Sequence, residues 1–148
     1  MRTYLKIHER EQDLKTAKWA KVVRARYWRV LNADDQTKLA GMLDRWSADE
    51  DFGVSHPELL VGDILERARK RTEKELNFVV MRLKMSGYEE TSKQVTQRIF
   101  RKLEGKDVTP SIDSDLEARF LQVEEAFWSS KEVTEVVREG SHVELNLS

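Results

Sequence analysis

The stretch that decides the fold is Ser55–Gly87, "SHPELLVGDILERARKRTEKELNFVVMRLKMSG". Ser55 and Glu58 have the spacing of a capping box, and Pro57 between them suits the first turn of a helix. Gly87 is placed to end the helix in a left-handed conformation. A helix of about thirty residues reaches about 45 Å, which is more than a compact domain of this size needs. The sequence therefore predicts one long helix.

The middle of this helix is poor in core residues. Between Glu66 and Glu75 only Ala68 and Thr72 can contact a core, so we expect the segment to leave the core or to lie in a subunit contact. Four cations follow the three- and four-residue spacing of one helix face. Internal pairs with Glu66 and Glu75 are the alternative to an open cationic ridge, whose members are Arg67, Lys70, Arg71 and Lys74.

Helical periodicity also dominates the first thirty residues. From about Leu14 to Leu31, one arc at 100° per residue collects the apolar side chains, and this arc predicts a core-facing stripe. Its members are Trp19, Ala20, Val23, Tyr27, Val30 and Leu31. The opposite side is basic and free to meet solvent or a partner; it contains Lys15, Lys18, Arg26 and Arg29.

Two further helices have clear start signals. Asn32 or Asp34 can cap a helix whose apolar residues repeat at positions i, i+3, i+4 and i+7; these are Leu39, Met42, Leu43 and Trp46. Ser111 or Asp113 can cap a helix that contains Leu116, Phe120, Val123 and Phe127.

The C-terminus is ambiguous. Val143, Leu145 and Leu147 alternate with polar residues, which is typical of a strand, and a hairpin back onto residues 133–137 would pair it. A capping box at Ser129 and Glu132 instead predicts a helix ending at Gly140. We expect a mainly α fold of about five helices, one or two of them long, with a short C-terminal strand or β-hairpin. Residues 1–130 form the helical domain and residues 131–148 a small appendage.

The stretch "GYEETSKQVTQRIFRKLEG", residues 87–105, predicts another amphipathic helix. Val95, Ile99 and Leu103 form its inward stripe, and Gly105 ends it. With the preceding helix and the glycine turn it has a loose helix-turn-helix outline, although the turn is longer than in the tight motif. Side chains suited to bases and phosphates are expected on its outer face: Lys93, Gln94, Thr96, Gln97, Arg98, Arg101 and Lys102. The alternative is an ordinary solvated face.

Charge alternates along the chain in four blocks, with net charges of +6 for residues 1–30, −7 for 31–66, +7 for 67–106 and −7 for 107–148. Three interpretations remain open. Basic and acidic segments can fold against each other, neighbouring subunits can meet through complementary faces, or the basic segments can bind polyanions.

Several functional classes lack support in the sequence. There is no cysteine, which excludes disulfides and thiolate metal sites. We find no phosphate loop, dinucleotide motif, nucleophile elbow or zinc-binding histidine pair. The three histidines are scattered, and the acidic stretch "DRWSADEDFG", residues 44–53, lacks the ligand pattern of a calcium loop. We therefore expect a cytoplasmic, non-enzymatic protein without catalytic residues, metal, cofactor, small-molecule substrate or membrane contact.

Two functions fit these features. The first is a regulatory or packaging protein that binds nucleic acid, which we expect to be DNA, as a homo-oligomer. It would use residues 93–102 as the groove helix and the other two cationic faces for phosphates. The second is a helical interaction or assembly module. An added feature of the first is "RARYWRV", residues 24–30, in which arginines alternate with Tyr27 and Trp28, a composition that can stack the bases of a single strand.

Overall fold

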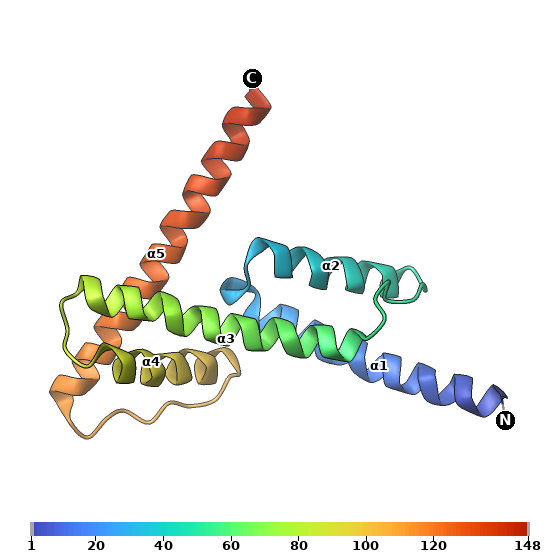
Figure 1. The fold of residues 1–148 in the computed structure, drawn as a ribbon, viewed down its shortest axis with the longest axis horizontal. Coiled ribbons are helices and arrows are strands. Elements are labelled where there is room, and N and C mark those ends of the chain that lie inside the picture. The colour runs from blue at the N-terminus through green and yellow to red at the C-terminus, as the bar shows by residue number, and fades with distance from the viewer. Residues whose placement is uncertain (1, 148) are drawn as a thin grey trace. The chain divides into compact units, whose positions relative to one another are not determined.

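The computed structural model describes the backbone of residues 2–147 and the side chains of residues 9–87 and 89–131. Over that backbone the chain is helical and has no strand (Figure 1). The elements are α1 (Arg2–Tyr27), a 3-10 turn η1 (Trp28–Val30), α2 (Ala33–Ser47), α3 (Pro57–Arg82), α4 (Tyr88–Leu103) and α5 (Ser114–Leu147). The prediction of a mainly α fold with long helices is confirmed.

The predicted C-terminal strand is wrong. Residues 143–147 and the hairpin partner at 133–137 belong to α5, which continues as a helix to Leu147. A strand at this place would need a partner to bond its N–H and C=O groups, and no other segment of the described backbone is extended into a sheet. A helix bonds these groups within the segment itself. The helical alternative begins earlier than the box at Ser129 suggested and passes through Gly140.

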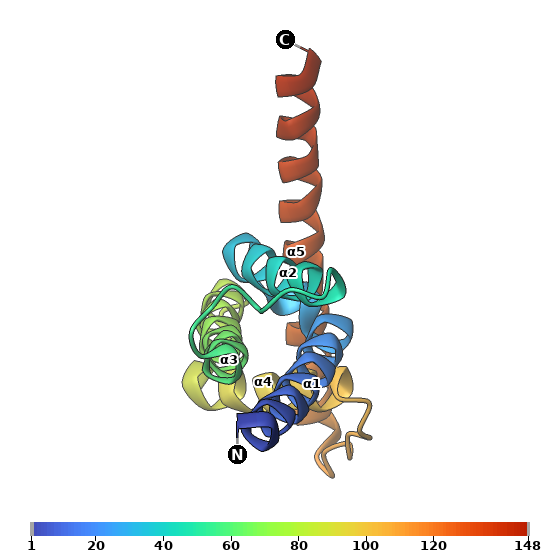
Figure 2. The ribbon, with the colours of Figure 1, turned by 90° about the vertical axis from the view of Figure 1, so that its right-hand side faces the viewer.

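The chain forms two compact units, residues 1–70 and residues 71–148, and the division falls inside α3. Figures 1 and 2 show that α1, α2 and the first half of α3 lie side by side in the first unit. In the second unit, α4 lies along the second half of α3, and α5 runs obliquely across α4 (Figure 1). The predicted division into residues 1–130 and an appendage at 131–148 stays a prediction.

The core of the first unit comes from the apolar stripes expected from the sequence. Ala20, Val23 and Tyr27 of α1 are buried, as are Leu39 and Met42 of α2. Trp19 departs from the expectation, because 39% of it is exposed. It lies at the edge of α1 facing α3, where its ring is 3.7 Å from the position that a Cβ on Gly62 would take.

The second unit is built on α4 as predicted. Val95, Ile99 and Phe100 are buried. Thr96 was expected on the outer face, but it is buried and its hydroxyl donates to the carbonyl oxygen of Ser92 at 2.7 Å. The helix ends at Gly105 as predicted, and the core residues contributed by α3 and α5 are Leu76, Val79, Val80, Phe120, Val123 and Phe127.

The poor core of the α3 middle has a structural counterpart. Ala68 and Thr72 are fully buried, and the division between the two units lies between them, after Lys70. Because few apolar residues of α3 lie near this boundary, the apolar contacts of each unit end close to it. The unit boundary therefore lies in the stretch of α3 that offers few apolar residues.

Helix ends depend on left-handed residues that the sequence only partly reveals. Gly87 has φ +65° but is the N-cap of α4, not the end of α3. The end of α3 is formed by Lys84, with φ +56°: its N–H donates to Met81 and the N–H of Met85 donates to Val80. This is the Schellman arrangement, and a lysine there bears the left-handed strain that glycine avoids.

We predict that Lys84→Gly stabilises the second unit. Removing the Cβ relieves the left-handed strain, and the gain exceeds the added chain entropy of glycine by about 0.5–1 kcal/mol. Urea denaturation followed by circular dichroism measures the change. Lys84→Ala is the matched control, because it removes the charge and keeps the Cβ. Equal stabilisation by both variants would show that the gain comes from charge and not from backbone conformation.

Candidate nucleic-acid interface

The outer face of α1 carries a group of exposed cations. Lys15, Lys18, Lys21 and Arg26 are exposed, and none of them forms an ion pair with any carboxylate whose side chain the structure describes. The core-facing side of α1, centred on Ala20 and Val23, holds the helix in the first unit. We call these four residues the α1 basic face. It begins after the acidic start of the described helix: Glu9, Glu11 and Asp13.

The helix geometry spreads the α1 basic face along one side. At 1.5 Å per residue, Lys15 and Arg26 are separated by about 17 Å along the axis. Lys15 and Lys18 are three residues apart, and so are Lys18 and Lys21, which places neighbouring cations on adjacent turns. Arg29, the fourth cation predicted here, is exposed in η1 and has an interaction partner, so we leave it out of this face.

The predicted groove helix, α4, uses its cations inside the protein. Arg98 is 11% exposed and donates through both terminal nitrogens to Glu117 of α5, with Nη1 at 2.9 Å from Oε2. Its guanidinium also lies 5.1 Å from the ring centre of Phe120. Lys102 donates to Glu124 at 2.7 Å, and that carboxylate is buried. These two pairs bind α4 to α5 and remove two of the expected phosphate contacts.

Of the other predicted side chains on α4, two form hydrogen bonds within the protein and two are exposed to solvent. Arg101 donates to the carbonyl oxygen of Asp107 in the following loop at 3.0 Å. Gln94 donates to Glu90 at 2.9 Å, one turn earlier. Lys93 and Gln97 are exposed. All four line a groove of about 560 Å³ between α4 and the loop before α5, but its wall carries Glu90 as well, so it is a mixed polar surface.

The ridge predicted on α3 is not one open surface. Arg67 donates to Asp35 of α2 at 2.9 Å; this carboxylate is almost fully buried, and its hydrogen bond raises the pKa of Arg67. Lys70 pairs with Glu66 one turn away at 3.3 Å. Arg71 is half-buried and has a partner, whereas Lys74 is exposed. The unit boundary separates the first two residues from the last two.

The acidic loop after α2 is organised by one arginine. Arg45 donates from Nε to the carbonyl oxygen of Asp51 and from Nη2 to its carboxylate at 3.1 Å. This side-chain hydrogen bond, together with the N–H of Gly53, lowers the pKa of Asp51. Phe52 stacks on Trp46 with ring centres 5.1 Å apart. The loop carboxylates therefore serve the local fold.

Other candidate chemistry can be placed only in part. Within the described side chains, no group of three acidic or histidine residues could hold a metal ion. His56 is exposed at the start of α3, while the side chains of His8 and His142 lie outside the described residues. No helix over the described range is long and apolar enough to cross a bilayer.

Sequence reasoning missed a groove between α1 and α2. Its volume is about 610 Å³, and it is lined by Lys21, Arg24, Ala25, Trp28, Leu43, Asp44 and Ser47. Arg24 lies 5.3 Å from the ring centre of Trp28. Residues 24–30 stand out in the sequence for their arginines and aromatic residues, and the four-residue spacing of Arg24 and Trp28 was the signal that could have brought this pair together.

Glu117 gives the second unit a predictable acid response. Hydrogen bonds from Arg98 and from the N–H of Ser111 hold the pKa of Glu117 below its ordinary value. A carboxylate with a lowered folded-state pKa stabilises the fold above its ordinary pKa, and this contribution is lost as pH falls through the lowered value.

We predict that Glu117→Gln is less stable than the parent at pH 7 and loses less stability between pH 7 and about pH 3, near and below the ordinary glutamate pKa. Urea denaturation of both proteins across this range measures the difference. Glu125→Gln is the control, because Glu125 is exposed on the same helix. An acid response that changes equally in both variants would contradict the role of the Arg98 pair.

No family model matches this chain, and no curated protein or solved structure matches it.

Proposed function

We propose that this chain binds nucleic acid, and specifically a DNA duplex, through the α1 basic face. The observation that carries the proposal is the contrast between α1 and α4. Arg98 and Lys102 of α4 have carboxylate partners on α5, whereas Lys15, Lys18, Lys21 and Arg26 have none among the described side chains. A cation without an internal partner is free to neutralise a phosphate.

The energetic basis of such binding is counterion release. Each phosphate neutralised by lysine or arginine frees condensed cations from duplex DNA, so affinity falls with salt at a slope of about 0.9 per contact. Four cations along about 17 Å of helix provide several such contacts. The four residues of this face are lysines and an arginine, and none is an amide side chain that would read a base edge. We therefore assign the face to contacts with the phosphate backbone of the duplex, which position a protein without specifying sequence.

The proposal moves the interface from the predicted groove helix to the first helix. A recognition helix needs its outer side chains free to reach base edges. In α4, Arg98 is largely buried, and Lys102 would have to leave a buried carboxylate to reach a ligand. Separating a fully buried pair leaves an uncompensated charge and costs about 3–5 kcal/mol. The cost is smaller for the Lys102 pair, because that lysine is about half exposed. Binding through α1 has no such cost.

We predict that changing Lys15, Lys18 and Arg26 together to alanine lowers duplex affinity and reduces the salt slope by about 2–3. Fluorescence anisotropy with a labelled duplex, titrated at salt concentrations from about 50 to 200 mM, measures both quantities. Circular dichroism confirms that the variant is folded. The three side chains are exposed, so we expect little change in stability.

The matched control is the combined change of Lys38, Lys70 and Lys106 to alanine. It removes the same net charge, but these three lysines pair with Asp34, Glu66 and Glu104 respectively. We expect the control to keep most of the parent's affinity. Equal losses in the two triple variants would indicate a response to net charge alone, and binding by neither parent nor variant would remove the proposal.

A second function is favoured by a different property of the same face. Leu14 and Val22 are 46% and 41% exposed and lie among its cations on the helix surface. Aliphatic side chains contribute little to phosphate binding but stabilise a protein contact when buried. The same face is thus suited to an acidic protein surface, and a second copy of this chain offers one in its 31–66 segment. Such head-to-tail contacts can close into rings.

Substituting serine for Leu14 and Val22 separates these functions. We predict that the double variant keeps the duplex affinity and salt slope of the parent, because it removes no charge. If the chain self-associates through α1, light scattering should show a lower mass for this variant than for the parent. A parent that is monomeric at low and high salt would exclude charge-driven self-association.

A further inference from the structure

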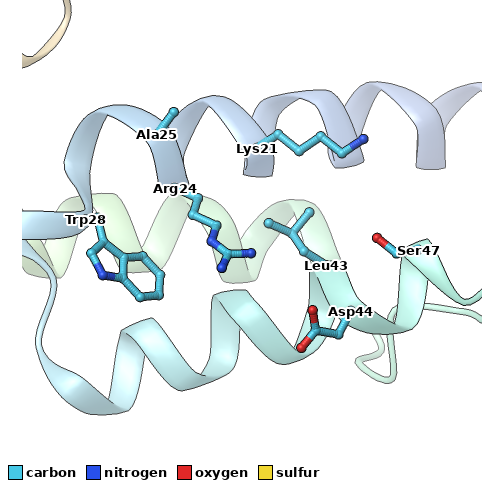
Figure 3. Close-up of a pocket in the computed structure, with 7 residues that line it drawn as sticks. All are labelled: Lys21, Arg24, Ala25, Trp28, Leu43, Asp44 and Ser47. Carbon is cyan, nitrogen blue, oxygen red and sulfur yellow. The ribbon is translucent and has the colours of Figure 1, made fainter.

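The groove between α1 and α2 in the first unit combines an aromatic surface with positive charge. Figure 3 shows Arg24 reaching from α1 between Trp28 and Leu43, with Asp44 and Ser47 along the α2 side. Trp28 is only half-buried, so part of its indole faces the groove. The volume of about 610 Å³ lies within the range of small-molecule sites in proteins, about 300–1,000 Å³.

The aromatic surface is fixed in position by the fold. Trp28 begins η1, directly after α1, and its carbonyl oxygen accepts from the N–H of Leu31 and from Nε2 of Gln36 at 3.0 Å. These bonds tie the backbone that carries the indole to the start of α2. With this backbone held, only the two side-chain torsions of Trp28 have to be fixed when a ligand stacks on the indole.

The charges in the groove favour an anionic ligand on the α1 side. Lys21 and Arg24 both line it, and no described carboxylate forms an ion pair with either. The guanidinium carbon of Arg24 lies instead 5.3 Å from the centre of the indole ring. A guanidinium that contacts an aromatic face still directs N–H groups outward in its own plane, where a phosphate can accept from them. Asp44 on the α2 side repels phosphate, but its oxygens accept hydrogen bonds from the donor groups of a base.

We infer that this groove binds an unpaired nucleobase of a single-stranded nucleic acid, stacked against Trp28, with the adjoining phosphate on Arg24 and Lys21. The inference rests on the proposed nucleic-acid function and adds an unpaired strand to the duplex as a second ligand class of this chain. Alternating aromatic and cationic side chains are how proteins bind single strands without sequence preference. Lys21 belongs to both the groove and the α1 basic face, so one strand can contact the two surfaces together.

The alternative occupant, an acidic segment of a protein, fits the groove less well. Its carboxylates would match Arg24 and Lys21, but Asp44 would face them from the opposite wall. A nucleotide carries its charge and its hydrogen-bonding base at different places, and in the groove the cations come from α1 whereas Asp44 and Ser47 come from α2 (Figure 3). This match of polarity across the groove is what selects the nucleotide.

The test compares a single-stranded deoxyribonucleotide of roughly 12 residues, within the site size of single-strand-binding modules, with a duplex of the same length. We predict that Trp28→Leu weakens single-strand binding by roughly 5- to 150-fold, the range for loss of one base stack. Trp28→Phe keeps a stacking ring and should retain most of the affinity. Duplex affinity should change little in either variant.

A crosslinking measurement on the parent protein avoids dependence on the folding of any variant. An oligonucleotide carrying 5-iodouracil is irradiated with the full chain, and the attachment site is mapped by mass spectrometry. Crosslinking at Trp28 supports the inference, and crosslinking confined to other aromatic residues overturns it.

The outcomes distinguish the groove from the proposed function. If the parent binds neither single strand nor duplex, the proposed function fails and the groove inference fails with it. If the parent binds both, but Trp28→Leu leaves single-strand affinity unchanged, the proposed function stands and the groove inference is wrong. Equal losses for single strand and duplex in Trp28→Leu would also overturn it, since the effect would then not be stacking on an unpaired base.

Discussion

The packing of α4 on α5 in the second unit depends on the ion pair between Arg98 and Glu117. It joins α4 to α5 through two hydrogen bonds, and both side chains are more than four-fifths buried. Glu117 also accepts from the N–H of Ser111, so the loop before α5 is held by the same carboxylate. Because this pair and the one between Lys102 and Glu124 are made within the unit, two of the four predicted α4 cations serve packing. Lys93 stays exposed without an ion pair among the described side chains.

Much of the fold could be predicted because helix formation depends on nearby residues. Asn32 caps α2 with its side-chain oxygen 2.8 Å from the N–H of Asp35, and Asp113 accepts from the N–H groups at the start of α5. Gly105 ends α4 as its sequence position indicated. These signals act over three or four residues, and apolar periodicity acts over one helix. Both can be read from a single chain.

The misjudged features depend on partners distant in sequence or on conformations that residue type disfavours. Periodicity placed Arg98 on the outer side of α4, but it could not show that Glu117, nineteen positions later, lies opposite. Lys84 takes a left-handed conformation that few lysines adopt. At the C-terminus, alternation over 143–147 resembled a strand, and the outcome depended on whether the chain held a second strand to pair with it.

The alternating charge blocks form different ion pairs in the two units. This difference bears on the three interpretations of the blocks, which were internal pairing, contact between subunits and binding of polyanions. In the second unit, cations of the 67–106 block pair with carboxylates of the 107–148 block, as Arg98 and Lys102 show. In the first unit, some carboxylates of the 31–66 block pair with cations of their own block, such as Asp34 with Lys38 and Asp51 with Arg45, and Glu66 pairs with Lys70 of the next block. Asp35 pairs with Arg67.

None of these acidic partners is available to α1, whose block has a net charge of +6. The first interpretation, internal compensation, thus accounts for the second unit and leaves the α1 basic face to the other two. The cations of the α1 basic face could be neutralised by a polyanion or by an acidic surface of a second copy. The groove beside it adds Trp28 and Asp44, groups that stack and accept hydrogen bonds, and a ligand that uses all of these features together is a nucleotide.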